Sequence, residues 1–438
     1  MLDYFKIKNF KSILDEKINF TTTKRLPNGY LEEESEEIYV LKNKEGKKYI
    51  PINAFWGANA SGKTNIIKAI NVFKNIATGQ INLENAFFPN KLLDKQENTI
   101  FELKTNIDNQ DYKYSIEYNN IEIVNEKLTF KDILLFEISK NEKDFKNIES
   151  KNESFFNEKY LSDFFDKTCI KNDKQIITFL SKSLKEFPNL NQKMVKFFNF
   201  LSKQLRIFPT NELPVGLAVD LLSNGNDDEN LQKAFDRIVE VLKNLDLSIS
   251  KMEFNREKKE LQENIDLSEY RNFDSVGISV KEKILKIDAM TSYHKNLSNR
   301  LIPFKFRQDE SQGTQILFGL IGAILKAFDD GAVLVIDELE RSLHPLIFIS
   351  IIKMFKNKYW NTNKTQLIFS THNTDILDDC ILRTTEINIV EKTLKNGTKI
   401  TNLDNFKNEV DGKKVRNVAN FRKQYLSGIY GGIPFPMK

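Results

Sequence analysis

The stretch that decides the fold runs from Gly57 to Thr64 and reads Gly-Ala-Asn-Ala-Ser-Gly-Lys-Thr. It satisfies the pattern G-x-x-x-x-G-K-[ST] in full, between a strand-like run, Tyr49–Trp56, and a helix-like run, Asn65–Ile76. In such a loop the glycines let backbone N–H groups point at phosphates, and the helix N-terminus adds a partial positive charge. The sequence therefore predicts a phosphate cradle.

The residues of the cradle have distinct expected roles. Lys63 should reach the β and γ phosphates of ATP, and the Thr64 hydroxyl should bind Mg²⁺. The other residues expected to contact the nucleotide are Asn59, Ala60, Ser61, Gly62 and Asn65. A chance match would be a surface turn before a helix, and the flanking strand and helix disfavour that alternative.

A second motif supplies two carboxylates. Val333–Ile336 is an apolar run that predicts a buried strand, and Asp337 and Glu338 follow it directly. Asp337 is expected to hold the Mg²⁺ shell, directly or through water, and Glu338 to polarise an attacking water. A strand ending in Asp-Glu is also common in α/β proteins without catalysis, but the P-loop in the same chain favours the catalytic interpretation.

Histidines offer a further candidate for catalysis. His372 follows a short apolar strand, Gln366–Ser370, at the end where ligands collect in open α/β sheets. There it could donate to a γ-phosphate, although a lone histidine is more often structural. His344 is expected to shape a turn or a dimer contact, and His294 to be structural.

A third motif, Glu310–Gln315 (ESQGTQ), opens an apolar helix over Ile316–Phe328. Ser311 at the helix start, Gly313 to admit a phosphate closely and the helix dipole make a second anion-binding end. Any capped helix could look similar in isolation. The order of P-loop, serine-glycine helix, Asp-Glu strand and His strand makes the motif specific.

The remaining pattern predicts an α/β fold in three parts. Residues 1–138 should form the N-terminal part of the nucleotide-binding domain, with an alternating edge strand at Tyr4–Phe10 and an antiparallel meander over Ile100–Phe136. Residues 139–299 read as a compact, mainly helical insertion, with an amphipathic helix from Leu231 to Leu245. Residues 300–438 return to a mixed sheet with alternating strands and helices.

Composition excludes several classes of protein. The chain has 438 residues and a net charge of +4, so no global basic field indicates nucleic acid, although a local basic patch is compatible with it. Cys169 and Cys380 are far apart, which gives neither a metal spacing nor a disulfide framework. The sequence shows no signal-peptide pattern and no apolar run near the roughly 20 residues of a membrane helix, so a cytoplasmic protein is expected.

Together the motifs resemble the ABC-type ATPases of the SMC, RecF and Rad50 kind, over roughly Met1–Glu126 and Leu301–Lys392. The resemblance implies that Ser311 and Gly313 of one copy act on the γ-phosphate of ATP bound to the P-loop of another. It also implies a D-loop at Leu339–Leu343.

Two further roles depend on the same resemblance. Lys11, in the opening stretch Ile-Lys-Asn-Phe-Lys-Ser, should lie near the nucleotide. A Q-loop glutamine is not evident, and Glu126, after the meander, is the residue expected in its place, close to Mg²⁺.

More narrowly, the motifs FWGANASGKTN, ESxGT, DELERSLHP and STHNTDILD resemble AAA15/AAA21-type ATPases of prokaryotic defence systems. The RloA and AbiL-like ATPases, the ATPase of the PARIS system and the ATPase half of OLD proteins are similar, and Phe421–Phe435 resembles the ending of RloA-type chains. On this resemblance, the chain is expected to lack an OLD-type TOPRIM nuclease domain. The resemblance therefore implies a separate effector, such as an RloB-like or TOPRIM-type nuclease.

The leading expectation is an ATP-hydrolysing sensor or switch of an anti-phage, abortive-infection system, working as a homodimer or larger assembly. The alternative is a RecF-like DNA-repair clamp with DNA as its partner, against which the near-neutral charge argues. The ATPase of a membrane transporter is disfavoured by the insertion. A nucleotide-binding protein without turnover stays open, because hydrolysis can depend on a partner.

Overall fold

The computed structural model describes most of the chain. The described residues are 1–23, 40–91, 93, 97–139, 178, 180–181, 191–209, 228–245, 248–254, 290–377, 381–393, 397–406 and 421–433. Cys169 and Cys380 lie outside them. The chain forms two compact units, one of Met1–Pro209, Gly331–Glu338 and Ile352–Lys438, the other of Thr210–Asp330 and Leu339–Ile351. Their boundaries fall at other positions than those expected from the sequence.

The first unit contains a large mixed sheet. In sheet order its strands are β10 (Leu205–Phe208), β14 (Val333–Ile336), β15 (Gln366–Ser370), β5 (Ile52–Trp56), β16 (Ile387–Thr393), β17 (Gly397–Asn402), β2 (Ile13–Asn19), β1 (Leu2–Phe10), β6 (Thr99–Ile107), β7 (Gln110–Tyr118), β8 (Ile123–Phe130) and β9 (Ile133–Ser139). From β10 to β16 the neighbours are parallel, and from β16 to β9 they are antiparallel. The expected α/β class with an antiparallel meander is confirmed.

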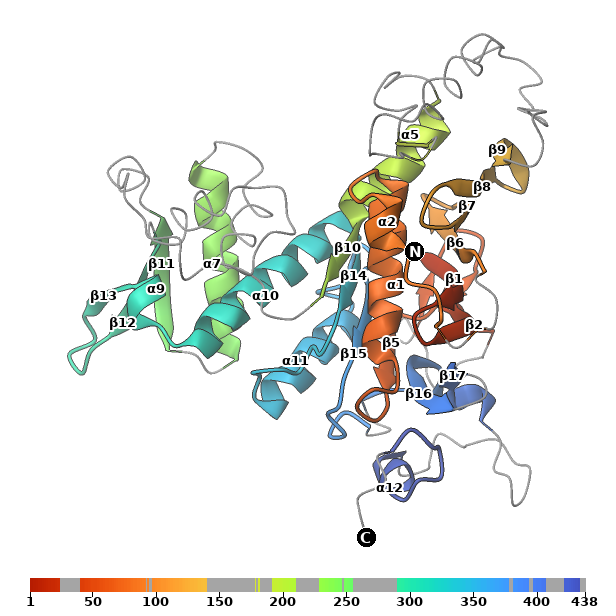
Figure 1. Cartoon of the computed structure of the whole chain (residues 1–438). Helices are drawn as coiled ribbons and strands as arrows, with labels where there is room; N and C mark the ends of the chain where they lie inside the picture. Colours follow the sequence, from red (N-terminus) through yellow and green to blue (C-terminus); the bar gives the residue numbers. More distant parts are fainter. Residues whose placement is uncertain are drawn as a thin grey trace. The chain divides into compact units, whose positions relative to one another are not determined.

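One helix, α1 (Lys63–Ala77), lies along a face of this sheet (Figure 1). Its buried side chains recur every three or four residues, as they do on a helix with one side in a core. The ring centroid of Phe73 lies 5.3 Å from that of Phe5 on β1 and 5.9 Å from that of Tyr114 on β7. This shared core fixes the axis of the helix that the P-loop leads into.

The expected edge strand at Tyr4–Phe10 lies in the interior of the sheet, which corrects that expectation. β1 pairs with β2 on one side and with β6 on the other. Its burial does alternate as the sequence indicated. Alternation reports that the two faces of a strand differ, and it carries no information about whether the two edges have partners.

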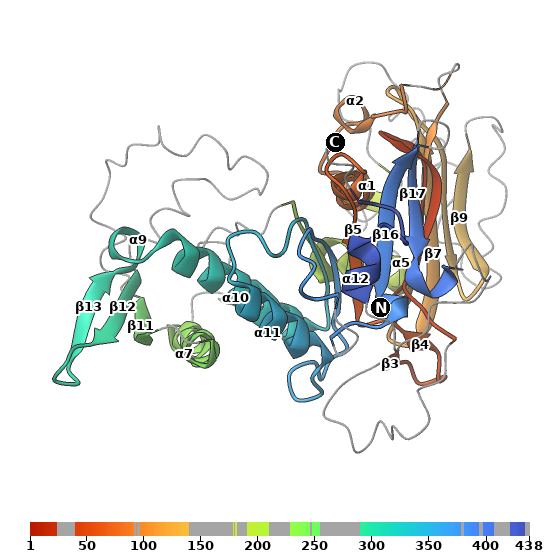
Figure 2. The same cartoon turned by 90° about the horizontal axis from the view of Figure 1, so that it is seen from below.

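The second unit combines helices with a small sheet. Its elements are α7 (Asp228–Asn244), α9 (Phe306–Asp309), α10 (Gln312–Asp330), the beginning of α11 (Pro345–Lys356), and the sheet of β11 (Ile249–Phe254), β12 (Met290–Lys295) and β13 (Leu301–Lys305). α7 is the amphipathic helix that the sequence predicted, and Figure 2 shows it end-on next to α10. The Phe235 ring of α7 lies 5.7 Å from the Phe318 ring of α10.

The region 139–299 is only partly helical in its described residues. It contributes α5 (Gln192–Asn199), the π-helix η1 (Phe200–Gln204) and α7, but also three strands. β10 joins the large sheet beside β14, and β11 and β12 belong to the small sheet. The sequences of these strands do not alternate strictly between apolar and polar residues, which is why the sequence did not indicate them.

The remaining elements are short. They are β3 (Leu41–Lys42), β4 (Lys48–Tyr49), α2 (Leu83–Ala86), the 3₁₀ turns η4 (Thr384–Glu386) and η5 (Leu403–Asn405), and α12 (Phe421–Leu426). None of the helices in the described ranges has the length and apolar character that crossing a membrane requires.

Candidate nucleotide-binding site

Three neighbouring parallel strands of the large sheet have their carboxyl ends side by side. β5 pairs with β15 in the register Phe55 to Ser370, and β15 pairs with β14 in the register Phe369 to Ile336. Neighbouring strands lie about 4.8 Å apart. The P-loop after β5, the Thr-His pair after β15 and the Asp-Glu pair after β14 therefore begin within roughly 10 Å of one another.

Two glycines of the P-loop are required by their surroundings. Gly62 has φ 114°, and a Cβ there would stand 2.2 Å from Thr398 Oγ1. A Cβ on Gly57 would stand 2.2 Å from the Val390 carbonyl oxygen. A side chain fits at neither position, because β16 and β17 pack directly against the loop. The conformation of the loop therefore depends on these strands as well as on its own glycines.

The expected ligand residues divide into a buried group and an exposed tip. Ser61, Gly62 and Lys63 are buried, whereas Asn59 and Ala60 are exposed at the tip of the loop. The Lys63 ammonium donates to the carbonyl oxygens of Gly57 and Ala58, at 2.7 and 3.1 Å. Its charge is thus held over the loop, where an anionic phosphate would find it together with the first amides of α1.

A buried hydroxyl in the same loop suits a polar ligand. Ser61 is 4% exposed, and its Oγ has no hydrogen-bond partner among the described residues. The Ser61 carbonyl, in contrast, accepts from Thr398 Oγ1 at 2.9 Å. Buried polar atoms are rarely left without a partner, so this hydroxyl fits a cradle that is completed by phosphate oxygens.

The Asp-Glu pair is positioned by a serine that the sequence did not indicate. The Ser370 hydroxyl donates to Asp337 Oδ1 and accepts from the backbone N–H of Glu338, the latter at 2.8 Å. Asp337 is 5% exposed, and Glu338 has a left-handed backbone with φ 49°. One hydroxyl thus fixes the carboxylate expected at Mg²⁺ and the turn that presents the expected base. The signal for it was the serine that ends the apolar run Gln366–Ser370.

His372 projects from a segment that is tied to the strand before the P-loop. On one side of it, the Thr371 N–H donates to the Phe55 carbonyl at 3.0 Å. On the other, the Asn373 carbonyl accepts from Trp56 Nε1 at 2.9 Å. The imidazole is exposed. It lies just past the carboxyl end of β15, beside the strand ends where the P-loop and the Asp-Glu pair begin, which is the place that the sequence predicted.

A family model described as "AAA domain, putative AbiEii toxin, Type IV TA system" (AAA_21) matches residues 52–378. This range holds the P-loop, the Asp-Glu strand and the His strand, and it covers more than half of the chain. The chain belongs to this AAA_21 family. With its complete P-loop, this AAA_21 domain is a nucleotide-binding ATPase domain of the P-loop class.

Solved structures similar to this AAA_21 chain include the SMC head domain from Thermotoga maritima, at 15% identity over 92% of this chain and 98% of that chain, with a TM-score of 0.40. The recombination mediator RecF of the RecFOR pathway is 14% identical over 89% of this chain and 95% of that chain, with a TM-score of 0.32. The Smc head domain from Pyrococcus yayanosii is 11% identical over 92% and 96%, with a TM-score of 0.36. No curated protein matches the chain.

Within the described part of the AAA_21 chain, no group of three or more His, Cys, Asp or Glu side chains could hold a metal ion by itself. Mg²⁺ usually takes only one or two protein oxygens and completes its shell with substrate phosphates and water. The Thr64 hydroxyl and the Asp337 carboxylate fit that requirement. They are the residues that would hold Mg²⁺ here.

Lys11 lies in the turn between β1 and β2, beside the first turns of α1. The next residue, Ser12, accepts from Asn65 Nδ2 at 2.7 Å. The Lys11 ammonium lies 4.6 Å from the centre of the Phe88 ring. Partial burial, together with the charge of Lys68 on α1, lowers the pKa of Lys11. The structure therefore brings the Lys11 turn next to the P-loop helix.

Glu126 is not brought to the P-loop, so its expected Mg²⁺ and Q-loop role receives no support. Its Oε1 accepts from the Tyr114 hydroxyl at 2.7 Å and from the Leu180 N–H at 3.1 Å, in the buried core. Thr178, next to this contact, donates to the carbonyl of Ala77, the last residue of α1. At 1.5 Å per residue, that end of α1 is about 20 Å from Lys63.

The serine-glycine motif opens α10 in the second unit. Ser311 precedes the helix, and its Oγ accepts from the Thr314 N–H at 3.1 Å, as an N-cap residue does. Ser311 and Gly313 are both exposed. The expected D-loop, Leu339–Leu343, precedes α11, where His344 Nδ1 accepts from the Leu346 N–H at 3.3 Å. This contact matches the turn-shaping alternative for His344.

The C-terminal segment is a part of the site that sequence reasoning did not place. Gly432 has φ 68°, and a Cβ there would stand 2.6 Å from Ile389 Cγ2 and 3.7 Å from Gly57 Cα. Arg422 on α12 pairs with Asp375, three residues after His372, at 2.9 Å. The segment therefore lies close to Gly57 of the P-loop and is paired with the chain that follows the His strand.

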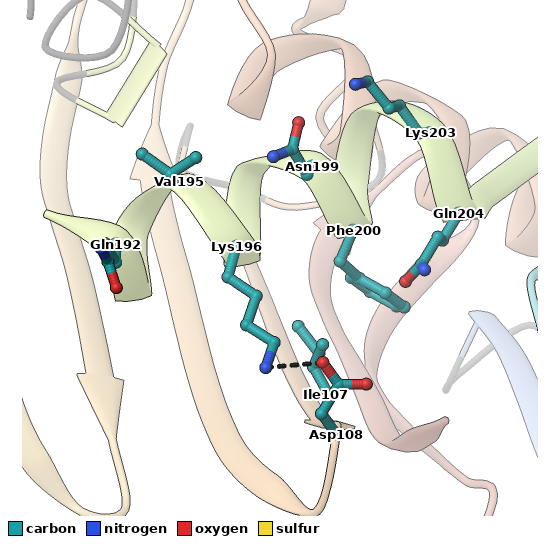
Figure 3. Close-up of a pocket in the computed structure, with 9 residues that line it drawn as sticks. All are labelled: Ile107, Asp108, Gln192, Val195, Lys196, Asn199, Phe200, Lys203 and Gln204. Carbon is teal, nitrogen blue, oxygen red and sulfur yellow. Dashed lines mark ion pairs between the residues drawn. The ribbon is translucent and has the colours of Figure 1, made fainter. Parts of the chain in front are cut away.

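A separate cavity of about 590 Å³ lies between α5, η1 and the turn after β6 (Figure 3). It is lined by Ile107, Asp108, Gln192, Val195, Lys196, Asn199, Phe200, Lys203 and Gln204. Two of the lining residues form an ion pair, with 2.6 Å between Lys196 Nζ and Asp108 Oδ2. The cavity and the P-loop lie near opposite ends of β1. The turn after β6 is next to the start of β1, whereas the Lys11 turn beside the P-loop helix follows the end of β1. This cavity is therefore distinct from the nucleotide site.

Proposed function

We propose that the chain is an ATP-driven switch in which two copies pair head to tail, so that the Ser311–Gly313 end of α10 in one copy covers ATP held by the P-loop of the other. In a prokaryotic anti-phage system this switch controls a separate effector protein, a nuclease by resemblance. The observation that most supports this proposal is an exposed glycine, Gly313, in the first turn of α10.

Among the described residues, no close neighbour explains a glycine at position 313. A Cβ at this position would have only Ser311 Oγ within 4 Å, at 3.8 Å, among the described residues. In the middle of a helix, glycine costs about 0.5–1 kcal/mol relative to alanine. An exposed glycine in the first turn of a long helix therefore supports a role in which another molecule approaches the backbone closely.

The surroundings of Gly313 favour an anion as that molecule. The first turn of α10 contains no acidic residue, and its N–H groups carry the positive end of the helix dipole. Ser311 adds a hydroxyl at the same end. A terminal phosphate is the ligand that such a helix end can bind, and the P-loop of a second copy would present one.

The residues that follow the carboxyl ends of β5, β14 and β15 can then hydrolyse the bound ATP. In this proposal Lys63 and His372 donate to the phosphate oxygens, and Thr64 with Asp337 holds Mg²⁺. Glu338 accepts a proton from the attacking water, whose oxygen bonds to the γ-phosphorus as the bond to the β-phosphate oxygen breaks. The products are ADP and inorganic phosphate.

Pairing is tested by measuring mass in solution, with light scattering on a sizing column. With ATP and Mg²⁺, Glu338→Gln should form a stable pair because it binds nucleotide without turning it over. Lys63→Ala and Gly313→Asp should remain single, and Gly313→Asp should still bind nucleotide. Ser350→Ala, a helical serine that donates to the Leu346 carbonyl, is the matched control. A single mass for every variant with and without ATP would contradict the pairing.

The defence role needs its own test, by plaque counts on cells that carry the chain with its neighbouring gene product. Lys63→Ala and Glu338→Gln should both lose protection, whereas Ser350→Ala should keep it. Equal protection by all of them would remove the defence role and leave the pairing proposal intact.

A further inference from the structure

We infer that His294, which the sequence indicated only as structural, is a positioning residue for the Ser311–Gly313 end of α10. The inference rests on the proposed function, and it deepens that proposal by naming what holds the phosphate-binding end in place. His294 acts through Glu310, the residue directly before Ser311.

Glu310 is tied to strand β12 by two side chains. His294 Nε2 lies 2.5 Å from Glu310 Oε1, and the Ser292 hydroxyl donates to the same oxygen at 2.6 Å. Ser248, directly before β11, holds the other side of the imidazole, with 3.0 Å between its Oγ and His294 Nδ1. The imidazole therefore bridges β11 and the start of α10.

This contact is mostly shielded from water. Ser292 is fully buried, the Glu310 side chain is 8% exposed and the His294 side chain is 21% exposed. An exposed ion pair on two long side chains contributes little and leaves its partners mobile. A carboxylate this deeply buried needs its hydrogen bonds, because burial without them is costly. The tie therefore restricts Glu310 to one position.

The backbone of Glu310 is held as well. Its N–H donates to the Phe306 carbonyl at 3.3 Å, and its carbonyl accepts from Gln315 Nε2 at 3.0 Å. Gln315 Nε2 also donates to the Arg307 carbonyl at 3.1 Å. With its side chain on β12, its N–H on α9 and its carbonyl on α10, Glu310 is a fixed point from which Ser311 starts.

The tie also directs a negative charge. A free carboxylate one residue before Ser311 would repel a phosphate approaching the helix end. His294 and Ser292 turn that carboxylate onto β12, so the first turn of α10 keeps its attraction for an anion. Loss of the His294 contact should therefore displace the phosphate-binding end and bring a charge of the wrong sign towards the phosphate.

Mixed pairs provide the test, because each nucleotide site of the proposed pair takes its P-loop from one copy and its α10 from the other. The acceptor copy carries Ser311→Asp and keeps its P-loop. The donor copy carries Lys63→Ala and keeps its α10. A mixed pair, isolated through two different affinity tags, then has one complete site, and its ATPase rate reports that site alone.

His294→Ala in the donor copy should lower this rate about 10- to 100-fold, the range that a small misplacement of a reacting group causes. The same substitution in the acceptor copy should have no such effect, because the α10 of that copy is already disabled. His294→Gln in the donor should recover most of the rate, since its amide N–H can replace the imidazole donor. Tyr293→Phe is the matched control: Tyr293, the neighbour of His294 on β12, donates to Glu253 and not to Glu310.

The outcomes separate the two ideas. A mixed pair that is no more active than either copy alone would overturn the pairing proposal itself. An active mixed pair that loses the same activity with His294→Ala in either copy would overturn the positioning role, as would equal losses for Gln and Ala in the donor. In the otherwise unchanged chain, His294→Ala should leave the Kd for ADP as it was while kcat falls.

Discussion

At the scale of single residues, the site depends on side chains that hold other side chains. The Ser370 hydroxyl holds both Asp337 and the turn of Glu338, and the Thr398 hydroxyl holds the backbone of the P-loop. These hydroxyls satisfy buried polar groups whose isolation would be costly. These contacts hold the expected catalytic groups in fixed positions, which is the arrangement that efficient electrostatic catalysis requires.

Ser370→Ala tests whether the Ser370 hydroxyl positions Asp337 and Glu338. The substitution leaves Asp337 Oδ1 and the Glu338 N–H without their partner, so the free energy of unfolding should fall by about 1–3 kcal/mol. The ATPase rate should fall with it, because Glu338 loses its fixed turn. Urea unfolding and steady-state ATPase assays measure both quantities.

Ser202→Ala is the control for this prediction, since within the described part of the chain the Ser202 hydroxyl donates locally, to the Phe198 and Asn199 carbonyls. If Ser370→Ala behaved like Ser202→Ala in both assays, the hydroxyl would not be what positions the acidic pair.

At the scale of elements, the P-loop is shaped by chain segments on both sides of it. β16 and β17 contact the backbone of Gly57 and Gly62, and the turn after α12 places Gly432 over the same region. α1 is held separately by its packing against β1 and β7. The loop is thus fixed at its start, at its end and along the helix that follows.

Gly432→Ala should weaken nucleotide binding, by about tenfold if 1.4 kcal/mol of the resulting strain reaches the P-loop. The new Cβ meets Ile389 Cγ2 at 2.6 Å, and this branched side chain has little freedom to move aside. Titration with a fluorescent ATP analogue measures the change.

Gly46→Ala is the matched control for this substitution. Gly46 has φ 79°, close to the 68° of Gly432, but an added Cβ would meet no described residue within 4 Å. It should therefore carry the same backbone strain without affecting the site. A Kd for Gly432→Ala that equals that of Gly46→Ala would show that the C-terminal segment does not support the P-loop.

At the scale of the whole molecule, the residues expected at the nucleotide belong to two compact units. Lys63, Asp337, Glu338 and His372 are in the first, and Ser311 and Gly313 are in the second. Under the proposed function, the P-loop can take up ATP in a single copy, whereas the α10 end meets a phosphate only when a second copy arrives. Binding and pairing should therefore be separable events.

Hydrogen exchange should show this separation. With Glu338→Gln and ATP, amides of residues 57–65 should be protected at every protein concentration, because a single copy binds the phosphates. Amides of residues 312–316 should gain protection only as the protein concentration rises. Lys63→Ala should show neither change. Equal protection of 312–316 in dilute and concentrated protein would contradict contact between copies.

Much of the fold, and the segments that carry the candidate site, could be predicted from the sequence alone. The P-loop, the Asp-Glu strand, the His strand and the helix behind Ser311 are each encoded within a few consecutive residues, whose periodicity and turn chemistry act locally. For these segments the strand, loop and helix assignments are confirmed.

Tertiary structure decided what depends on residues far apart in the chain. It placed β1 inside the sheet, put Glu126 in the core near the far end of α1, set Ser370 against Asp337 and brought His294 to Glu310. No spacing within a segment encodes such contacts, because each depends on where packing of the whole chain brings a second segment. Local chemistry thus determined which groups are available, and packing determined which of them meet.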